Sequence, residues 1–225
     1  MEIPQLDIPS GQRIGIVGNN GAGKTSFLSM LLDLVEPSTG AIFNKDVNVN
    51  QRETWKEFTS SYLDDNFLVD YLTPEEYFQF TGDLRGISST DLWKMLERCG
   101  HFFNGEILGK RKYLRDFSKG NRKKIGVAAA LLGSPQVIVL DEPFANLDPG
   151  SQVVLKGILL SVSKQYEASL IVSSHDLHHL TDICDRIILI NKGKIEMDRV
   201  VTPETLEELT SFFAAEDIQG QPNIK

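Results

Sequence analysis

The sequence is poor in cysteine and contains no long apolar run. Its only cysteines, Cys99 and Cys184, lie far apart and outside any metal-ligand spacing, so we expect two reduced, buried thiols of a cytosolic protein. No run approaches the roughly 18 apolar residues that a membrane helix needs, and the first residues lack the basic start of a leader peptide. We therefore expect a chain that does not cross a bilayer by itself.

Basic residues are also outnumbered. The chain has 23 Lys and Arg against 31 Asp and Glu, a net charge of -8, so no nucleic acid is expected as a general partner. One local run is basic: Lys110, Arg111, Lys112, Arg115, Arg122, Lys123 and Lys124. This run could be a solvated face or a small nucleic-acid-binding patch, although it has few interleaved aromatic residues.

The pattern of apolar residues predicts an α/β protein. In 225 residues, a hydrophobic content of 41% suffices for one substantial core. Strands that alternate with helices favour a mainly parallel sheet with both faces covered. We expect strands at 13–17, 41–43, 47–49, 137–140, 169–172 and 186–190, and helices at 24–35, from Pro149 onward and at 176–184.

Residues 73–132 have a different, helical pattern, which predicts an α-helical subdomain inserted into the sheet domain. Thr73 and Pro74 form a helix start there, and a second helical stretch runs from Ser89 to Cys99. We therefore divide one domain, 1–225, into a core of 1–66 and 134–200, a helical subdomain of 67–133, and a C-terminal helix and tail of 201–225.

A glycine-rich loop joins the first strand to the first long helix. It fits the pattern G-x-x-x-x-G-K-[ST] with Gly18, Asn19, Asn20, Gly21, Ala22, Gly23, Lys24 and Thr25, followed by Ser26. Glycines let several backbone N–H groups converge on a phosphate at the positive end of the helix. Lys24 adds a point charge toward the β and γ phosphates, and Thr25 adds a hydroxyl for Mg²⁺. The loop thus predicts a nucleotide site in a phosphate-loop (P-loop, RecA-like) NTPase core.

Two acids end the apolar strand 137–140. Asp141 and Glu142 therefore lie at the carboxyl edge of the sheet, where α/β proteins bind ligands. Asp141 can hold the cation of Mg·ATP, and Glu142 can polarise a water molecule that attacks the γ phosphate. Without the phosphate loop, a pair of solvated acids would be the simpler interpretation.

Three further segments carry polar residues at helix starts or strand ends. Ser118 is placed as the N-cap of an apolar helix over 125–132, whose first amides form a second anion site. Asp148 precedes Pro149 at another helix start, which needs no chemistry. His175 follows the strand 169–172 and can reach a γ phosphate, although an exposed histidine would be the simpler interpretation. His178 and His179 are expected on the surface of the next helix.

In this order and spacing, five motifs resemble the nucleotide-binding subunit of an ATP-binding cassette (ABC) transporter, over nearly the whole chain. They are residues 18–25, Ser118-Lys119-Gly120-Asn121, Leu140-Asp141-Glu142-Pro143, Asn146-Leu147-Asp148 and Ser174-His175. Residues 71–77 and the Ser-Lys-Gly form of the second motif further resemble subunits that serve exporters of drugs, lipids, polysaccharides or peptides.

The resemblance implies a head-to-tail homodimer or heterodimer that holds two ATP molecules with Mg²⁺. Each ATP lies between the phosphate loop of one subunit and residues 118–121 of the other, which we call the signature segment. Lys24, Glu142 and His175 are the implied catalytic residues, with Glu142 as base and His175 as γ-phosphate switch, and Asp148 couples the two sites. The implied partner is a separate membrane permease, which places the chain on the cytoplasmic, inner face of the membrane.

The sequence departs from the family pattern in two places. Asp65 aligns best with a glutamine that links the Mg²⁺ site to the helical lobe, so we expect Asp65, Thr25 and Asp141 at the metal. Residues 1–17 are too few for the family's first strands and lack an aromatic residue to stack on adenine. From this we expect a truncated start, a reduced sheet edge and weak discrimination between bases.

Three other functions remain open. A nucleotide-gated regulatory module with little turnover is compatible with Asp65 and the short start. A non-transport ABC-type ATPase, for example one that remodels a nucleoprotein, lacks a second cassette or coiled-coil insertion to support it. A small-molecule kinase would keep the phosphate loop but leave the signature segment unexplained.

Overall fold

The computed structural model describes residues 1–220 and contains one large sheet. Its six strands have the order β4-β5-β6-β1-β7-β8. In this spatial order the first five strands, β4, β5, β6, β1 and β7, pair in parallel, and β8 pairs antiparallel with β7. Their bounds are β1 (Arg13–Val17), β4 (Thr59–Tyr62), β5 (Val137–Leu140), β6 (Ser169–Ser174), β7 (Arg186–Asn191) and β8 (Lys194–Val200), and a separate hairpin joins β2 (Phe43–Asn44) to β3 (Val47–Asn48).

Eight α-helices and three short 3₁₀ helices surround this sheet in the described residues. The α-helices are α1 (Lys24–Leu31), α2 (Pro74–Leu84), α3 (Ser89–Arg98), α4 (Gly100–Phe103), α5 (Lys119–Ala130), α6 (Pro149–Tyr166), α7 (Leu177–Ile183) and α8 (Thr205–Gly220). The 3₁₀ helices are η1 (Thr54–Glu57), η2 (Asp65–Phe67) and η3 (Leu114–Asp116). Over the part of the chain described, no helix is both long and apolar enough to span a membrane. Residues 221–225 of the expected tail lie outside the described residues.

The central strands are apolar on both faces, as a covered parallel sheet requires. Along β5, Ile138 and Leu140 face one apolar cluster, whereas Val137 and Val139 face the other. The second cluster lies on the face that α1 covers, and α6 and α7 contribute to the first. The alternation follows from the two-residue period of a strand and leaves the sheet buried between two layers.

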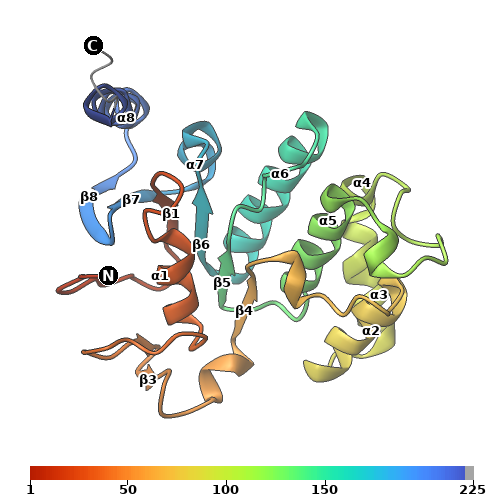
Figure 1. Cartoon of the computed structure of the whole chain (residues 1–225). Coiled ribbons are helices and arrows are strands. Elements are labelled where there is room, and N and C mark those ends of the chain that lie inside the picture. Colours follow the sequence, from red (N-terminus) through yellow and green to blue (C-terminus); the bar gives the residue numbers. More distant parts are fainter. Residues whose placement is uncertain (221–225) are drawn as a thin grey trace.

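The inserted helices gather beyond the β4 edge of the sheet (Figure 1). Helix α2 begins with a complete capping box, in which Thr73 and Glu76 satisfy each other's backbone amides. Phe78, Phe102 and Phe103 pack inside this group and belong to the same apolar cluster as Leu140 of β5. The helical lobe is therefore continuous with the core rather than packed separately.

Most predicted elements are confirmed, and the misses have local causes. The parallel α/β fold is as expected, and each predicted strand overlaps an observed one, although the strand predicted at 41–43 is found as β2 (Phe43–Asn44). Helix α1 ends at Leu31 instead of residue 35, because Asp33 takes a positive φ of 54° and the amide of Leu34 bonds the carbonyl of Ser29. Strands β4 and β8 were not predicted: β4 has only one apolar residue, Tyr62, and β8 is a largely exposed antiparallel edge.

Candidate active site

The phosphate loop lies between β1 and α1, as its sequence predicts. Gly21 and Gly23 have φ values of 80° and 112°, which favour glycine, and a Cβ on Gly18 would overlap the carbonyl of Ile190. Asn19, Asn20, Gly21, Thr25 and Ser26 are exposed, while Ala22 and Lys24 are buried. The Lys24 ammonium folds back and donates to the carbonyl of Gly18 at 2.7 Å. The loop is thus an open cradle of amides with its cation held inside.

Asp141 is fixed at the end of β5 by two hydroxyl groups. Thr25 Oγ1 donates to Asp141 Oδ2 at 2.6 Å, and the buried Ser173 Oγ donates to Asp141 Oδ1. The same Ser173 oxygen accepts the amide of Glu142 at 2.9 Å. The β5–β6 register pairs Leu140 with Val172 and so brings Ser173 beside the two acids. Sequence reasoning missed Ser173, whose only signal is a polar residue at the end of a buried strand.

Glu142 lies between a cation and an imidazole. Its Oε2 is 2.8 Å from Nδ1 of His175, and its Oε1 is 3.7 Å from Nζ of Lys24. The backbone of Glu142 takes a positive φ of 48°, which turns the chain sharply after β5. The structure therefore brings together the three residues predicted to be catalytic, at the carboxyl edge of the sheet.

The signature segment lies at the start of α5. Ser118 caps the helix by accepting the amide of Asn121 at 3.3 Å, and both Ser118 and Lys119 are exposed. A Cβ on Gly120 would lie 2.7 Å from the carbonyl of Asn146, so only glycine allows this close approach. Helix α5 begins at Lys119, earlier than the predicted apolar stretch from residue 125, because the cap sets its first turn.

Asp148 caps α6, as the Asp-Pro sequence predicts. Its carboxylate accepts the amide of Ser151 at 2.9 Å. Hydrogen bonds from Ser151 lower the pKa of Asp148 below its ordinary value, with a smaller contribution from Lys124. The Asp148 side chain is 62% exposed, so it remains accessible to another molecule.

Asp65 is engaged by Tyr62 and Arg122. The Tyr62 hydroxyl donates to Asp65 Oδ1, and Arg122 Nε is 3.9 Å from Oδ2. Burial and this hydrogen bond raise the pKa of Tyr62. Among residues 1–220, no three His, Cys, Asp or Glu side chains form a group that could hold a metal. Thr25 and Asp141 suit Mg²⁺, which commonly takes one or two protein oxygens together with phosphate oxygens and water.

One histidine prediction is wrong. His179 is largely buried, with its ring centroid 4.6 Å from that of Phe144, and burial is the main cause that lowers its pKa.

The thiols behave as expected: both are free and buried, and burial raises the pKa of Cys99 to about 11.

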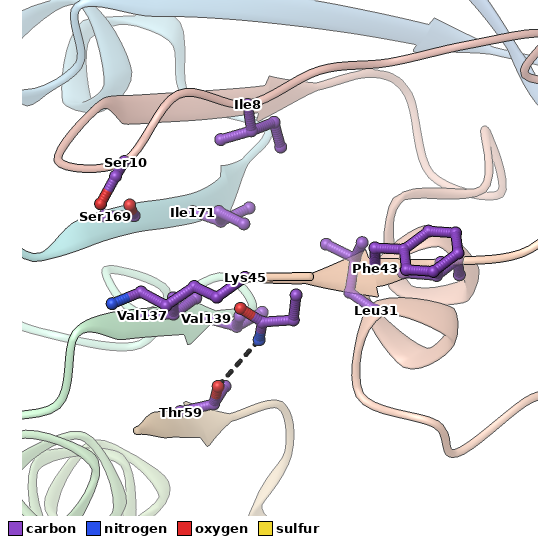
Figure 2. A pocket seen from close by; sticks show the side chains of 12 residues that line it. Ile8, Ser10, Leu31, Phe43, Lys45, Thr59, Val137, Val139, Ser169 and Ile171 are labelled. Carbon is purple, nitrogen blue, oxygen red and sulfur yellow. Dashed lines mark hydrogen bonds between the residues drawn. The ribbon is translucent and has the colours of Figure 1, made fainter. Parts of the chain in front are cut away.

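A distinct apolar hollow of about 230 Å³ lies at the other end of the strands. It touches Val137 at the start of β5 and Ser169 at the start of β6, and Phe43 of the hairpin lies beside it (Figure 2). The acids follow the opposite, carboxyl ends of the strands, so this hollow does not belong to the candidate active site.

A family model and several known proteins match the chain. The model of the ABC transporter family matches residues 2–145. The chain is 29% identical over 225 residues to the ABC transporter ATP-binding protein NatA of Bacillus subtilis, covering 96% of this chain and 89% of that protein. It is 33% identical over 214 residues to the uncharacterized ABC transporter ATP-binding protein YhaQ of the same organism, covering 95% and 68%.

Other relatives are longer. The chain covers 53% of an uncharacterized ABC transporter ATP-binding protein of Synechocystis and 21% of ABC transporter A family member 6 of Arabidopsis thaliana. Among solved structures, an ATP-binding subunit of an ABC transporter superposes with a TM-score of 0.77 at 24% identity, covering 91% of this chain and 83% of its own. The post-hydrolysis dimer of the cassette MJ0796 with ADP and Pi superposes with a TM-score of 0.76 at 20% identity, covering 88% of each chain.

The parallel sheet, the phosphate loop and the acids that follow β5 define a nucleotide-binding domain of the phosphate-loop class. Within this class, the chain belongs to the ABC transporter family, as an ATP-binding subunit.

Proposed function

We propose that the chain hydrolyses ATP in a head-to-tail dimer and thereby drives transport by a separate membrane permease. The observation that carries the proposal is the cluster of Lys24, Glu142 and His175 beside the Thr25–Asp141 pair. A phosphate loop alone would support nucleotide binding. A carboxylate held next to that loop supports hydrolysis, because it can take the proton of an attacking water.

The triphosphate would lie on the amides of the phosphate loop, residues 18–26, with Lys24 turned from the carbonyl of Gly18 toward the β and γ phosphates. Thr25 and Asp141 would hold Mg²⁺, which neutralises charge on the phosphates when bound. Asp65 would join this metal set through Oδ2, because the Tyr62 hydroxyl bonds only its Oδ1.

Glu142 would orient the attacking water and accept its proton while the water oxygen bonds the γ phosphorus and the bond to the bridging oxygen breaks. His175, 2.8 Å from Glu142 Oε2, would hold the carboxylate and reach the γ phosphate. Lys24 would offset the negative charge shared by the phosphate and Glu142.

The second half of each site would come from another subunit. Ser118 and Lys119 are exposed at the N-terminus of α5, where unpaired amides attract a phosphate. Exposed Asp148 at the start of α6 would contact the partner across the same face. Dimeric solved cassettes of similar fold support this arrangement. A homodimer and a heterodimer would use the same contacts.

The permease would dock between the sheet core and the helical lobe. A groove there is lined by Leu34, Trp55 and Phe67, and Phe67 is 61% exposed. These apolar side chains lie where the core (1–66 and 134–200) meets the helical lobe (67–133). Such a groove suits a helix of a membrane protein. We therefore place the chain at the inner face of the membrane, and we favour a permease of the exporter type on the form of the signature segment.

The trapping variant Glu142→Gln tests this function. Removing the base should stop hydrolysis and leave ATP between two subunits, so size-exclusion chromatography should show a dimer with ATP and a monomer without it. Lys24→Ala in the same background is the control, and it should stay monomeric because the phosphates lose their cation. A monomeric Glu142→Gln protein at saturating ATP contradicts the shared site.

A regulatory module with little turnover is the second candidate, favoured by Asp65 at the position of the expected glutamine. Wild-type hydrolysis that does not exceed that of Lys24→Ala, even with membranes containing the permease, would support the regulatory module. Turnover well above this control supports the ATPase.

A further inference from the structure

Three consecutive cations in the first turns of α5 are not a solvated basic face. The Arg122 side chain is 14% exposed, and Lys123 and Lys124 are 8% and 3% exposed. Cations near a helix N-terminus are unfavourable because of the helix dipole, and this first turn contains no acid. Their position therefore needs compensating partners, and each of the three finds them in a different loop of the candidate active site.

Arg122 reaches the segment that follows β4. Its Nη2 donates to the carbonyl of Asp65 at 3.0 Å, and its Nη1 forms an ion pair with Asp70 Oδ1 at 2.7 Å. The Tyr62 hydroxyl holds the Asp65 side chain. Asp65 is thus tied to α5 through its backbone carbonyl, while its carboxylate is held by Tyr62 of β4 and lies 3.9 Å from Arg122 Nε.

Lys123 reaches the proposed catalytic acid. Its Nζ donates to the main-chain carbonyl of Glu142 at 2.7 Å and lies 5.7 Å from the centroid of the Tyr62 ring. Ser173 binds the amide of the same residue, so both backbone polar groups of Glu142 are held. Burial lowers the pKa of Lys123, and the nearby acids Asp65, Glu142, Asp141 and Asp64 oppose that shift.

Lys124 reaches the start of α6. Its Nζ is 3.7 Å from Asp148 Oδ2 and 3.9 Å from Glu106 Oε2, and it lies over the ring of Phe102 at 5.8 Å. Asp148 is the residue proposed to meet the partner subunit. Asp148 and the backbone of Glu142 therefore both contact the first two turns of α5.

We propose that Arg122, Lys123 and Lys124 are positioning residues that couple the signature segment to Asp65, Glu142 and Asp148 of the same subunit. This inference rests on the proposed function. When the partner's nucleotide binds residues 118–121, the start of α5 is fixed. The three cations of α5 then fix the loops that contain Asp65, Glu142 and Asp148 in the same subunit. A buried ion pair adds little stability by itself, whereas it can select one arrangement of the elements it joins.

The test separates positioning of Glu142 from nucleotide binding. Lys123→Met keeps the aliphatic stem but removes the donor, so hydrolysis at saturating ATP should fall at least tenfold. In the Glu142→Gln background, the same substitution should leave the ATP concentration for half-maximal dimerisation within about twofold, since the dimer contacts remain. Lys123→Arg, which restores charge and donors, should recover most of the hydrolysis.

Lys110→Met is the matched control, because Lys110 belongs to the same basic run and is exposed. It should leave both measurements unchanged. Hydrolysis of Lys123→Met within twofold of wild type, or a parallel loss of dimerisation, would overturn the proposal. If Lys123→Met does not melt cooperatively, Lys123→Gln is measured by the same criteria. Failure of Glu142→Gln alone to dimerise would instead count against the proposed function.

Discussion

At the scale of single residues, the site depends on side chains that hold other side chains. Asp141 accepts from Thr25 and Ser173, and Glu142 contacts His175 and is held at its backbone by Ser173 and Lys123. Carboxylates held in this way do not need to reorganise when substrate binds, which is a main source of catalytic efficiency in such sites.

Ser173→Ala should lower hydrolysis at saturating ATP by about tenfold. A hydrogen bond to a charged group is worth about 1.5 to 3 kcal/mol, and about 1.4 kcal/mol corresponds to tenfold in rate. The buried Asp141 would lose one of its two hydroxyl donors, and the amide of Glu142 would lose its acceptor. Steady-state kinetics check the effect, with Ser173→Thr as control. Hydrolysis by Ser173→Ala at the wild-type rate would contradict the positioning role.

At the scale of elements, α5 approaches β4 so closely that a side chain is excluded between them. A Cβ on Gly126 would overlap the ring of Tyr62 far inside van der Waals contact. Tyr62 in turn bonds Asp65 and lies under Lys123. Gly126 therefore sets the distance between α5 and β4, and with it the distance from Arg122 and Lys123 to their partners.

Gly126→Ala should destabilise the protein by about 1 to 3 kcal/mol, the usual cost of overpacking. The matched control is Gly157→Ala in α6, where a Cβ would meet nothing within 4 Å. There the smaller backbone entropy of alanine should stabilise by about 0.4 to 1 kcal/mol. Urea unfolding followed by circular dichroism measures both. If the two variants changed the free energy of unfolding equally, the close approach would not matter.

At the scale of the whole molecule, a pair of residues far apart in the sequence joins the start of β1 to the segment before β7. The guanidinium of Arg13, at the start of β1, binds the carboxylate of Asp185 just before β7, and the Asp185 carboxylate also accepts the Arg13 amide at 3.1 Å. The hydrogen bond with Arg13 is the main cause that lowers the pKa of Asp185.

This pair predicts a pH dependence of stability. A carboxyl group whose pKa is lower in the folded than in the unfolded protein stabilises the fold above its unfolded pKa, about 3.9 for Asp. That contribution is lost as the pH falls through the folded pKa. Asp185→Asn should therefore be less stable than wild type at pH 7, with a difference that shrinks below about pH 4. Thermal melts from pH 7 to 2.5 test this, and a constant difference would contradict it.

Much of the molecule could be predicted from local sequence. Residues 18–25 specify their loop because glycines, lysine and threonine act within one turn of chain, and β5 and β6 follow from short apolar runs bounded by polar residues. The caps at Thr73, Ser118 and Asp148 are equally local, since each bonds an amide three residues later.

Other features required the tertiary structure. The sequence by itself determined the class of the fold and the chemistry of the loop, the acids and the histidine. Only the β5–β6 register decided that Ser173 lies beside Asp141, and only the packing of α5 on β4 decided that a basic run turns inward to Asp65, Glu142 and Asp148. The physical reason is that these partners are separated by at least 19 residues along the chain, so no local pattern records their contact.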